Sequence, residues 1–118
     1  MARHGEATPD GELTPAGRRQ ASLLGERLAT VPLTGVFHSP VARAARTAEI
    51  VASSVDVPLT ETELLDDYPP TDALVALNAA NAALTVLQFR EDRVTLVTFN
   101  DQSHLPADLR WTGFPTSF

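Results

Sequence analysis

The chain has 118 residues, 43% of them hydrophobic, which is enough for one domain with a modest apolar core. Its net charge of −6 argues against non-specific nucleic-acid binding, because a phosphate backbone attracts basic surfaces. The sequence has no cysteine, no apolar run long enough to span a bilayer and no visible signal peptide, so it predicts a cytoplasmic protein without disulfides, thiolate metal sites or a membrane partner.

The chain opens on the tetrad Arg3-His4-Gly5-Glu6. A neutral imidazole can attack phosphorus, and a neighbouring guanidinium can bind phosphate oxygens through two parallel hydrogen bonds. The tetrad therefore places a candidate nucleophile, His4, beside a candidate anion ligand, Arg3. A lone Arg-His pair is more often a surface feature, so the weight of this motif depends on the rest of the chain.

Helix and strand signals alternate after the tetrad. Thr14 is a predicted helix N-cap with Pro15 at the first helical position, and apolar residues at helical spacing predict a helix over 15–29. The sequence then predicts a short buried strand over 35–38, a helix over 41–54 and a strand over 57–60. This order predicts an α/β layer architecture with a parallel core.

The character of the chain changes from Glu61 onward. An acidic stretch ends at Tyr68-Pro69-Pro70, residues 71–83 are ambiguous, and 84–89 and 94–99 are two β-rich runs. Because a polar four-residue connection separates these runs, we expect a β-hairpin. We expect 100–118 to be an ordered loop packed on the body of the domain.

Three motifs together resemble the histidine phosphatase superfamily, also called phosphoglycerate-mutase-like, and residues 77–115 resemble the C-terminal end of a bacterial branch of it. They are Arg-His-Gly-Glu at 3–6, Leu-Thr-Pro-Ala-Gly-Arg-Arg-Gln-Ala at 13–21, and His-Ser-Pro-Val-Ala-Arg-Ala-Ala-Arg-Thr-Ala-Glu at 38–49. The resemblance implies a single domain over 1–118, with a three-layer fold whose mostly parallel central sheet is flanked by helices, plus a C-terminal β-hairpin. It also implies a metal-independent phosphatase that needs no cofactor and hydrolyses a small-molecule phosphomonoester through a phosphohistidine.

The resemblance implies roles for individual residues. His4 corresponds to the phosphorylated nucleophile, and Arg3 and Arg43 correspond to the two phosphate-binding arginines. Glu6 belongs to the same phosphate site, where it can orient the loop. Asp67 is our choice of proton donor from the acidic stretch, although this stretch can equally be a solvated loop.

The sequence also departs from the family pattern. Asp10 stands where many members carry an Asn that touches the phosphate, so we expect Asp10 to face outward or to hydrogen-bond the turn at Gly11. No residue matches the second catalytic His of the family, since His38 is expected at the rim and His104 lies near the C-terminus. By comparison with the family, we expect a middle segment near 70–77 to be lacking. Either it is deleted, or the sequence joins pieces of a longer protein.

Three other functions therefore remain open. Without a second His, the chain can be a degenerate, non-catalytic domain that binds phosphate or a phosphorylated ligand. A phosphoglycerate-mutase-type phosphotransferase is also compatible with the motifs. An acidic interaction domain, whose hairpin over 84–99 pairs with a partner strand, would explain the hairpin but not the tetrad.

Overall fold

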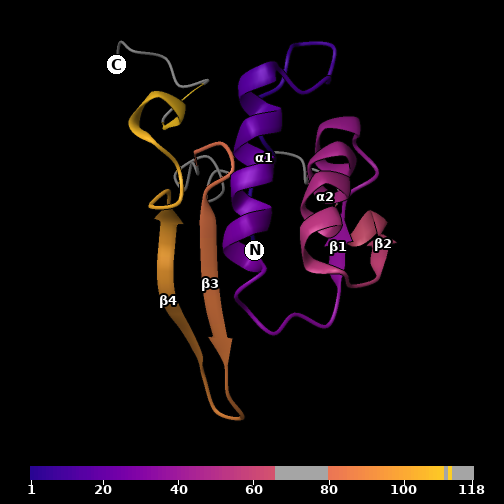
Figure 1. The fold of residues 1–118 in the computed structure, drawn as a ribbon. Helices are drawn as coiled ribbons and strands as arrows, with labels where there is room; N and C mark the ends of the chain where they lie inside the picture. The colour runs from indigo at the N-terminus through magenta and orange to yellow at the C-terminus, as the bar shows by residue number, and fades with distance from the viewer. Residues whose placement is uncertain (66–79, 111, 113–118) are drawn as a thin grey trace.

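The computed structural model describes residues 1–65, 80–110 and 112, which form a mixed α/β structure (Figure 1). Figure 1 shows helix α1 lying between a pair of long strands and a unit made of one helix and two short strands. The elements are, in chain order, α1 (Pro15–Leu28), β1 (Val36–His38), α2 (Ala42–Val55), β2 (Leu59–Glu61), the 3₁₀ turn η1 (Glu63–Leu65), β3 (Leu84–Phe89), β4 (Val94–Asp101) and the 3₁₀ turn η2 (Ala107–Leu109).

Helix α1 begins where its capping signals predict. The Thr14 hydroxyl accepts a hydrogen bond of 3.0 Å from the Gly17 amide, and Pro15 occupies the first turn, where its missing N–H costs no hydrogen bond. The helix ends at Leu28, one residue before the predicted end, because Ala29 is already the C-cap. Leu24 and Ala21 are buried on one face, as the helical spacing indicates.

The strand–helix–strand unit is also present. β1 and β2 pair in parallel, with Val36 opposite Leu59, and α2 connects them. The helix ends at Val55, and its C-cap Asp56 adopts the left-handed conformation (φ 49°) that terminates helices. β1 is less buried than the sequence suggests, because the side chain of Phe37 is 63% exposed.

The two β-rich runs form an antiparallel pair, β3 and β4, joined by residues 90–93. The pair extends beyond the body of the molecule in Figure 1, and several of its apolar side chains are exposed, among them Phe89 at 72% and Val97 at 59%. Near its other end, Thr85 pairs with the first residue of the chain, since its amide donates to the Met1 carbonyl at 2.7 Å.

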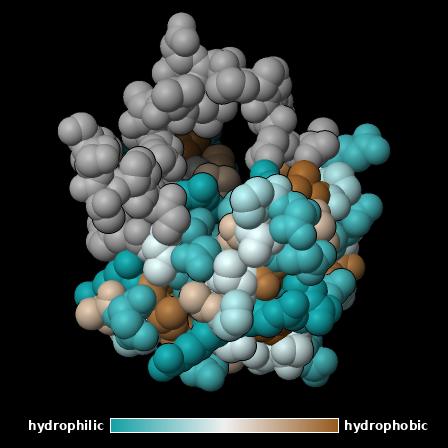
Figure 2. Space-filling view, turned by 90° about the horizontal axis from the view of Figure 1, so that it is seen from above, coloured by the Kyte–Doolittle hydropathy of each residue, from teal (hydrophilic) through white to brown (hydrophobic). Residues whose placement is uncertain are grey.

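The core of the described part lies between α1 and the segments that flank the β3–β4 pair. One cluster of buried core residues there consists of Ala82, Leu105 and Leu109, with Leu23 of α1 packed against them. The part of the predicted C-terminal loop that the structure describes thus packs on the body, through Leu105 and Leu109. Seen from above, hydrophilic residues cover most of the described surface, with apolar residues showing between them (Figure 2).

The β structure differs from the predicted central sheet. In residues 1–65 and 80–110 the strands form two separate two-stranded sheets, one parallel and one antiparallel, and no three-layer arrangement is present there. The physical reason is that no described strand lies between β1 and the N-terminal segment to join the two sheets. The predicted missing segment near 70–77 lies outside the described residues. Within them, no helix is both long and apolar enough to cross a bilayer.

Candidate functional site

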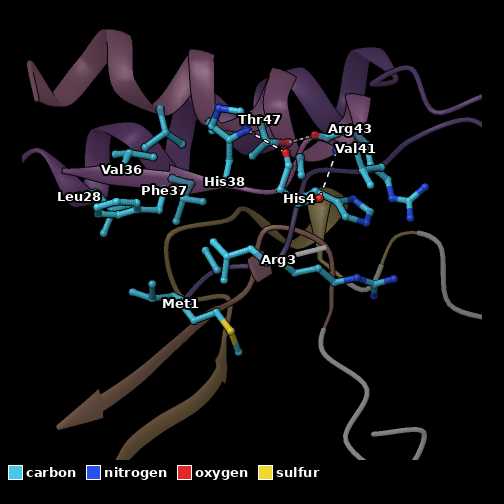
Figure 3. A pocket seen from close by; sticks show the side chains of 18 of the residues that line it. Met1, Arg3, His4, Leu28, Val36, Phe37, His38, Val41, Arg43 and Thr47 are labelled. Atoms are coloured by element: carbon cyan, nitrogen blue, oxygen red, sulfur yellow. Dashed lines mark hydrogen bonds between the residues drawn. The ribbon is translucent and has the colours of Figure 1, made fainter. Parts of the chain in front are cut away.

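Arg3, His4 and Arg43 lie around one cavity of about 610 Å³. Figure 3 shows these three side chains at one end of the cavity, whereas Leu28 and Phe37 lie at the other end. The tetrad reaches this position because the chain turns from its N-terminal segment into α1, and Arg43 reaches it from the first turn of α2. The structure therefore brings together three of the residues that the sequence predicts for a phosphate site.

The ring of His4 is held in one orientation by the backbone of the next residue. Its Nδ1 lies 2.7 Å from the carbonyl oxygen of Gly5. A carbonyl oxygen can only accept, so Nδ1 must carry the hydrogen, and in the neutral ring the lone pair is then on Nε2. A lone pair fixed on one known atom is what a nucleophilic histidine requires.

Thr47 ties the tetrad to helix α2. Its hydroxyl accepts a hydrogen bond of 3.1 Å from the Gly5 amide and donates one of 2.7 Å to the carbonyl of Arg43, one helical turn earlier. The side chain is buried, with 6% of its surface exposed. Thr47 therefore fixes the residue that follows His4 relative to the turn of α2 that carries Arg43.

A close approach of two glycines brings the tetrad against α1. A Cβ added to Gly5 would overlap the carbonyl oxygen of Gly17, and a Cβ added to Gly17 would overlap the carbonyl oxygen of Glu6. Since the obstructing atoms are backbone, neither side can give way easily. Gly5 of the first motif and Gly17 of the second thus allow one close contact between their backbone segments.

Glu6 contacts α1 and is not among the described residues that line the cavity. Its carboxylate accepts a hydrogen bond of 2.8 Å from the Thr14 hydroxyl, and its amide donates one of 2.8 Å to Gln20. Gln20 is completely buried, and its Nε2 donates to the Leu109 carbonyl at 2.8 Å. These contacts hold the loop of the tetrad on the N-terminal half of α1.

The second arginine of the third motif lies apart from this cavity. Arg46 forms an exposed ion pair of 2.6 Å with Glu49 on α2 and is not among the lining residues. Asp10 is exposed, as expected for an outward-facing residue, and a hydrogen bond from Thr8 lowers the pKa of its carboxyl. The predicted proton donor Asp67 lies outside the described residues.

The two other histidines occupy different places. His38, at the end of β1, lines the cavity and repeats the arrangement of His4, with its Nδ1 2.8 Å from the Ser39 carbonyl oxygen. His104 is not among the described lining residues. It lies near Arg27 and Asp101, and its pKa is lowered by burial and by the positive charge of Arg27.

Sequence reasoning missed the supporting residues Gly17, Gln20 and Thr47. A signal existed for Gln20, because it lies four residues before the buried Leu24, on the face of the helix that the apolar pattern marks as core. Thr47 lies one turn after Arg43, where a short hydroxyl can reach the backbone. Its hydrogen bond to Gly5, 42 positions earlier in the chain, is not visible in the sequence.

The chain is similar to known proteins over part of its length. The chain is similar to the mitochondrial serine/threonine-protein phosphatase Pgam5 of Caenorhabditis briggsae, with 38% identity over 77 residues, 59% of this chain and 27% of that protein. The Pgam5 protein of Caenorhabditis elegans is 39% identical over 77 residues, with the same coverage. The solved structure of Bacillus stearothermophilus YhfR matches at a TM-score of 0.49 with 36% identity, over 52% of this chain and 36% of that one.

The chain thus spans about a quarter of the length of the two Pgam5 proteins that it matches. Both come from animals, so they do not support the predicted bacterial branch, which stays a prediction. The model of the histidine phosphatase superfamily (branch 1) matches residues 1–69, more than half of the chain, including all three motifs. The chain therefore belongs to the histidine phosphatase superfamily.

Proposed function

We propose that this chain carries the nucleophile and the phosphate-binding arginines of a metal-independent phosphatase, which hydrolyses a phosphomonoester through a phosphohistidine at His4. The observation that supports the proposal most directly is the hydrogen bond from His4 Nδ1 to the Gly5 carbonyl, because it leaves the lone pair on Nε2. Arg3 and Arg43, at the same end of the cavity, supply the positive charge that a phosphoryl group needs.

In the proposed reaction, Nε2 of His4 attacks phosphorus and the bond to the leaving alcohol oxygen breaks. This oxygen takes a proton from a general acid, for which Asp67 stays the predicted group. Water then attacks phosphorus and returns a proton to the conjugate base of that acid, the P–N bond breaks, and the products are inorganic phosphate and the free histidine. Arg3 and Arg43 would neutralise the charge on the non-bridging oxygens in both steps. Glu6 would act as a positioning residue through Thr14.

The proposal is tested by mixing the purified chain with p-nitrophenyl phosphate and quenching in alkali, where phosphohistidine survives. We expect mass spectrometry to locate one added phosphoryl group on the peptide that contains His4, and His4→Gln to abolish it. His38→Gln is the matched control, since His38 lines the same cavity with the same Nδ1 hydrogen bond but should leave the labelling intact. Labelling that persists in His4→Gln would refute the assignment.

One observation favours a second candidate, a non-catalytic domain that binds a phosphorylated ligand. His38 is the only other histidine among the described residues that line the cavity. It belongs to the motif that contains Arg43, so it does not correspond to the second catalytic His of the family. The same experiment separates the two functions. Inorganic phosphate that binds the chain in calorimetry without any labelling of His4 would favour the binding domain. Phosphotransfer to a second alcohol in place of water would identify a mutase.

The kind of substrate and the cellular location are further proposals. A small phosphorylated substrate and a cytoplasmic location follow from the resemblance and the composition respectively, and both are properties of the whole protein. The Pgam5 proteins are named as mitochondrial serine/threonine-protein phosphatases, which adds phosphorylated protein as a second class of substrate to test.

A further inference from the structure

The peptide group that joins His4 to Gly5 is hydrogen-bonded at both of its ends. Its carbonyl oxygen accepts from the Ala82 amide at 2.9 Å, and its N–H donates to the Thr47 hydroxyl at 3.1 Å. Thr47 belongs to α2, whereas Ala82 lies just before β3 in the second half of the chain. Two segments far apart in the sequence therefore fix the plane of this peptide. A rotation of the plane would move the Gly5 carbonyl away from His4 Nδ1, which lies 2.7 Å from it.

Residues 80–83 form a buried turn that holds the tetrad from the side opposite α2. The Ala83 amide donates to the Ala80 carbonyl at 3.1 Å, which closes the turn, and the Ala83 carbonyl accepts from the Arg3 amide at 3.1 Å. Ala82 adopts a left-handed conformation (φ 54°), which its Cβ disfavours. Contacts around the turn must therefore hold this conformation in place.

Asn100, near the end of β4, supplies such a contact at the first residue of the turn. Its Oδ1 accepts a hydrogen bond of 2.7 Å from the Ala80 amide. Because Ala80 is completely buried, its amide would have no partner from solvent if this acceptor were removed. Asn100 is itself left-handed (φ 56°), a conformation that Asn adopts more readily than most residues. Its position thus requires both a tolerant backbone and an oxygen that reaches Ala80.

From these contacts we infer that Asn100 is a positioning residue for His4, which acts through the turn 80–83 and the His4–Gly5 peptide. The inference rests on the proposed function and adds a residue from the second half of the chain to it. Asn100 is not among the described residues that line the cavity. It therefore sets the orientation of the nucleophile without touching the phosphoryl group.

Loss of this support should slow the attack on phosphorus more than it weakens the binding of phosphate. Attack requires a near-ideal placement of His4 Nε2, and a displacement of about 1 Å costs roughly 10²-fold in rate. Phosphate binding depends on the guanidinium groups of Arg3 and Arg43, whose long side chains can follow a small shift of the backbone. The rate of phosphotransfer and the affinity for phosphate should therefore respond differently.

Two variants of Asn100 test this difference. Asn100→Gly removes the acceptor but allows the left-handed backbone, whereas Asn100→Asp keeps an oxygen at the same place on a residue that also tolerates it. With p-nitrophenyl phosphate, we expect the initial rate of His4 labelling to fall at least about ten-fold in Asn100→Gly and to stay within about three-fold in Asn100→Asp. The Kd for inorganic phosphate, measured by calorimetry, should change less than about three-fold in both.

Three results would overturn the inference. One is an unchanged labelling rate in Asn100→Gly, and another is an equal loss of rate in Asn100→Asp. The third is a loss of phosphate affinity as large as the loss of rate, because a general loosening of the fold would affect both. If Asn100→Gly does not fold, Asn100→Ser replaces it, since the serine oxygen is one bond shorter and should give a loss in the same direction.

Asp101→Asn is the matched control at the neighbouring residue. The Asp101 carboxylate bonds to Arg27 of α1 at 2.6 Å and accepts from the Ser103 amide at 2.8 Å. Its replacement therefore weakens the same end of β4 without removing the acceptor of the Ala80 amide. We expect Asp101→Asn to be labelled at the wild-type rate. A loss like that of Asn100→Gly would assign the effect to stability and refute the role of Asn100.

The tautomer of His4 gives a second readout that needs no turnover. Long-range proton–nitrogen NMR spectra of the neutral ring should show the hydrogen on Nδ1, and the His4 signals are identified by their loss in His4→Gln. In Asn100→Gly we expect the tautomer with the hydrogen on Nε2 to appear as well. An unchanged tautomer in the folded variant would contradict the inference.

The two proposals fail in different ways. A wild-type chain that is never labelled would refute the phosphatase, while the tautomer comparison would still decide the role of Asn100. Equal labelling of the wild type and Asn100→Gly would refute the role of Asn100 and keep the phosphatase.

Discussion

The hydroxyl of Thr47 is predicted to stabilise both the fold and the phosphate end of the cavity. Thr47→Val keeps the shape of the side chain but removes the acceptor of the Gly5 amide, which lies 3.1 Å away in a buried position. The carbonyl of Arg43 keeps its helical hydrogen-bond partner, so only one buried donor loses its partner. An unsatisfied buried amide costs about 1–3 kcal/mol, which is the expected decrease in the free energy of unfolding.

Thr47→Ser provides the matched control for this experiment. It keeps the hydroxyl and loses one methyl group, for which we expect a cost of about 0.8 kcal/mol. Urea unfolding measures both variants, and repeating it with inorganic phosphate measures how far the ligand stabilises each. Because Gly5 follows His4 directly, we expect the Val variant to gain less stability from phosphate than the Ser variant does. If Thr47→Val is as stable as Thr47→Ser and binds phosphate equally well, the assigned role of the hydroxyl is wrong.

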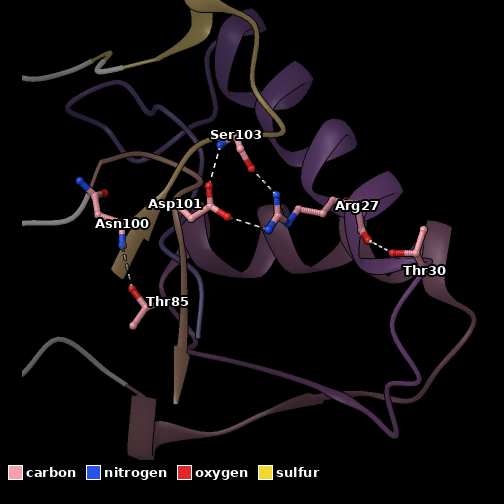
Figure 4. Close-up of polar contacts among 6 residues, drawn as sticks. All are labelled: Arg27, Thr30, Thr85, Asn100, Asp101 and Ser103. Atoms are coloured by element: carbon pink, nitrogen blue, oxygen red, sulfur yellow. Dashed lines mark hydrogen bonds and ion pairs between the residues drawn. The ribbon is translucent and has the colours of Figure 1, made fainter. Parts of the chain in front are cut away.

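Three further predictions concern stability. Gly17→Ala should destabilise the fold by about 2 kcal/mol or more in urea unfolding, because its Cβ would overlap the backbone of Glu6. Gly25→Ala should cost less, because its Cβ would meet the Ser54 hydroxyl at 2.9 Å and backbone only at 3.3 Å; equal costs would refute the close contact at Gly17. Arg27 forms an ion pair of 2.6 Å with Asp101 and also donates a hydrogen bond to Ser103 (Figure 4). A double-mutant cycle of Arg27→Met and Asp101→Asn should give a coupling energy of about 1 kcal/mol, which should decrease in 1 M salt. Burial lowers the pKa of His104 in the folded chain, so protonation favours the unfolded state. The free energy of unfolding should therefore be highest above pH 6.5 and decrease as the pH falls through the lowered pKa. His104→Gln should flatten this part of the pH profile in urea unfolding, and an unchanged profile would contradict the burial of the ring.

Local signals predicted most of the elements within a residue or two. Thr14 and Pro15 mark the start of α1 because capping and ring geometry act within one turn. The strands β3 and β4 lie where the two β-rich runs were expected, since that pattern also spans only a few residues. β2 begins at Leu59, two residues after its predicted start, because no capping residue marks where a strand begins.

The motifs of the sequence by themselves determined the family and predicted three residues that line one cavity, Arg3, His4 and Arg43. Only the tertiary structure decided how these residues are supported and what lies beside them. The hydrogen bond from Gly5 to Thr47 joins positions 42 apart, and the pairing of Ala2 with Leu84 joins the chain start to β3. Such contacts depend on how helices and strands pack, which no local pattern specifies. Among the described residues, the lining of the cavity depends on this packing too, because it comes from the N-terminal segment, α1, α2 and β1.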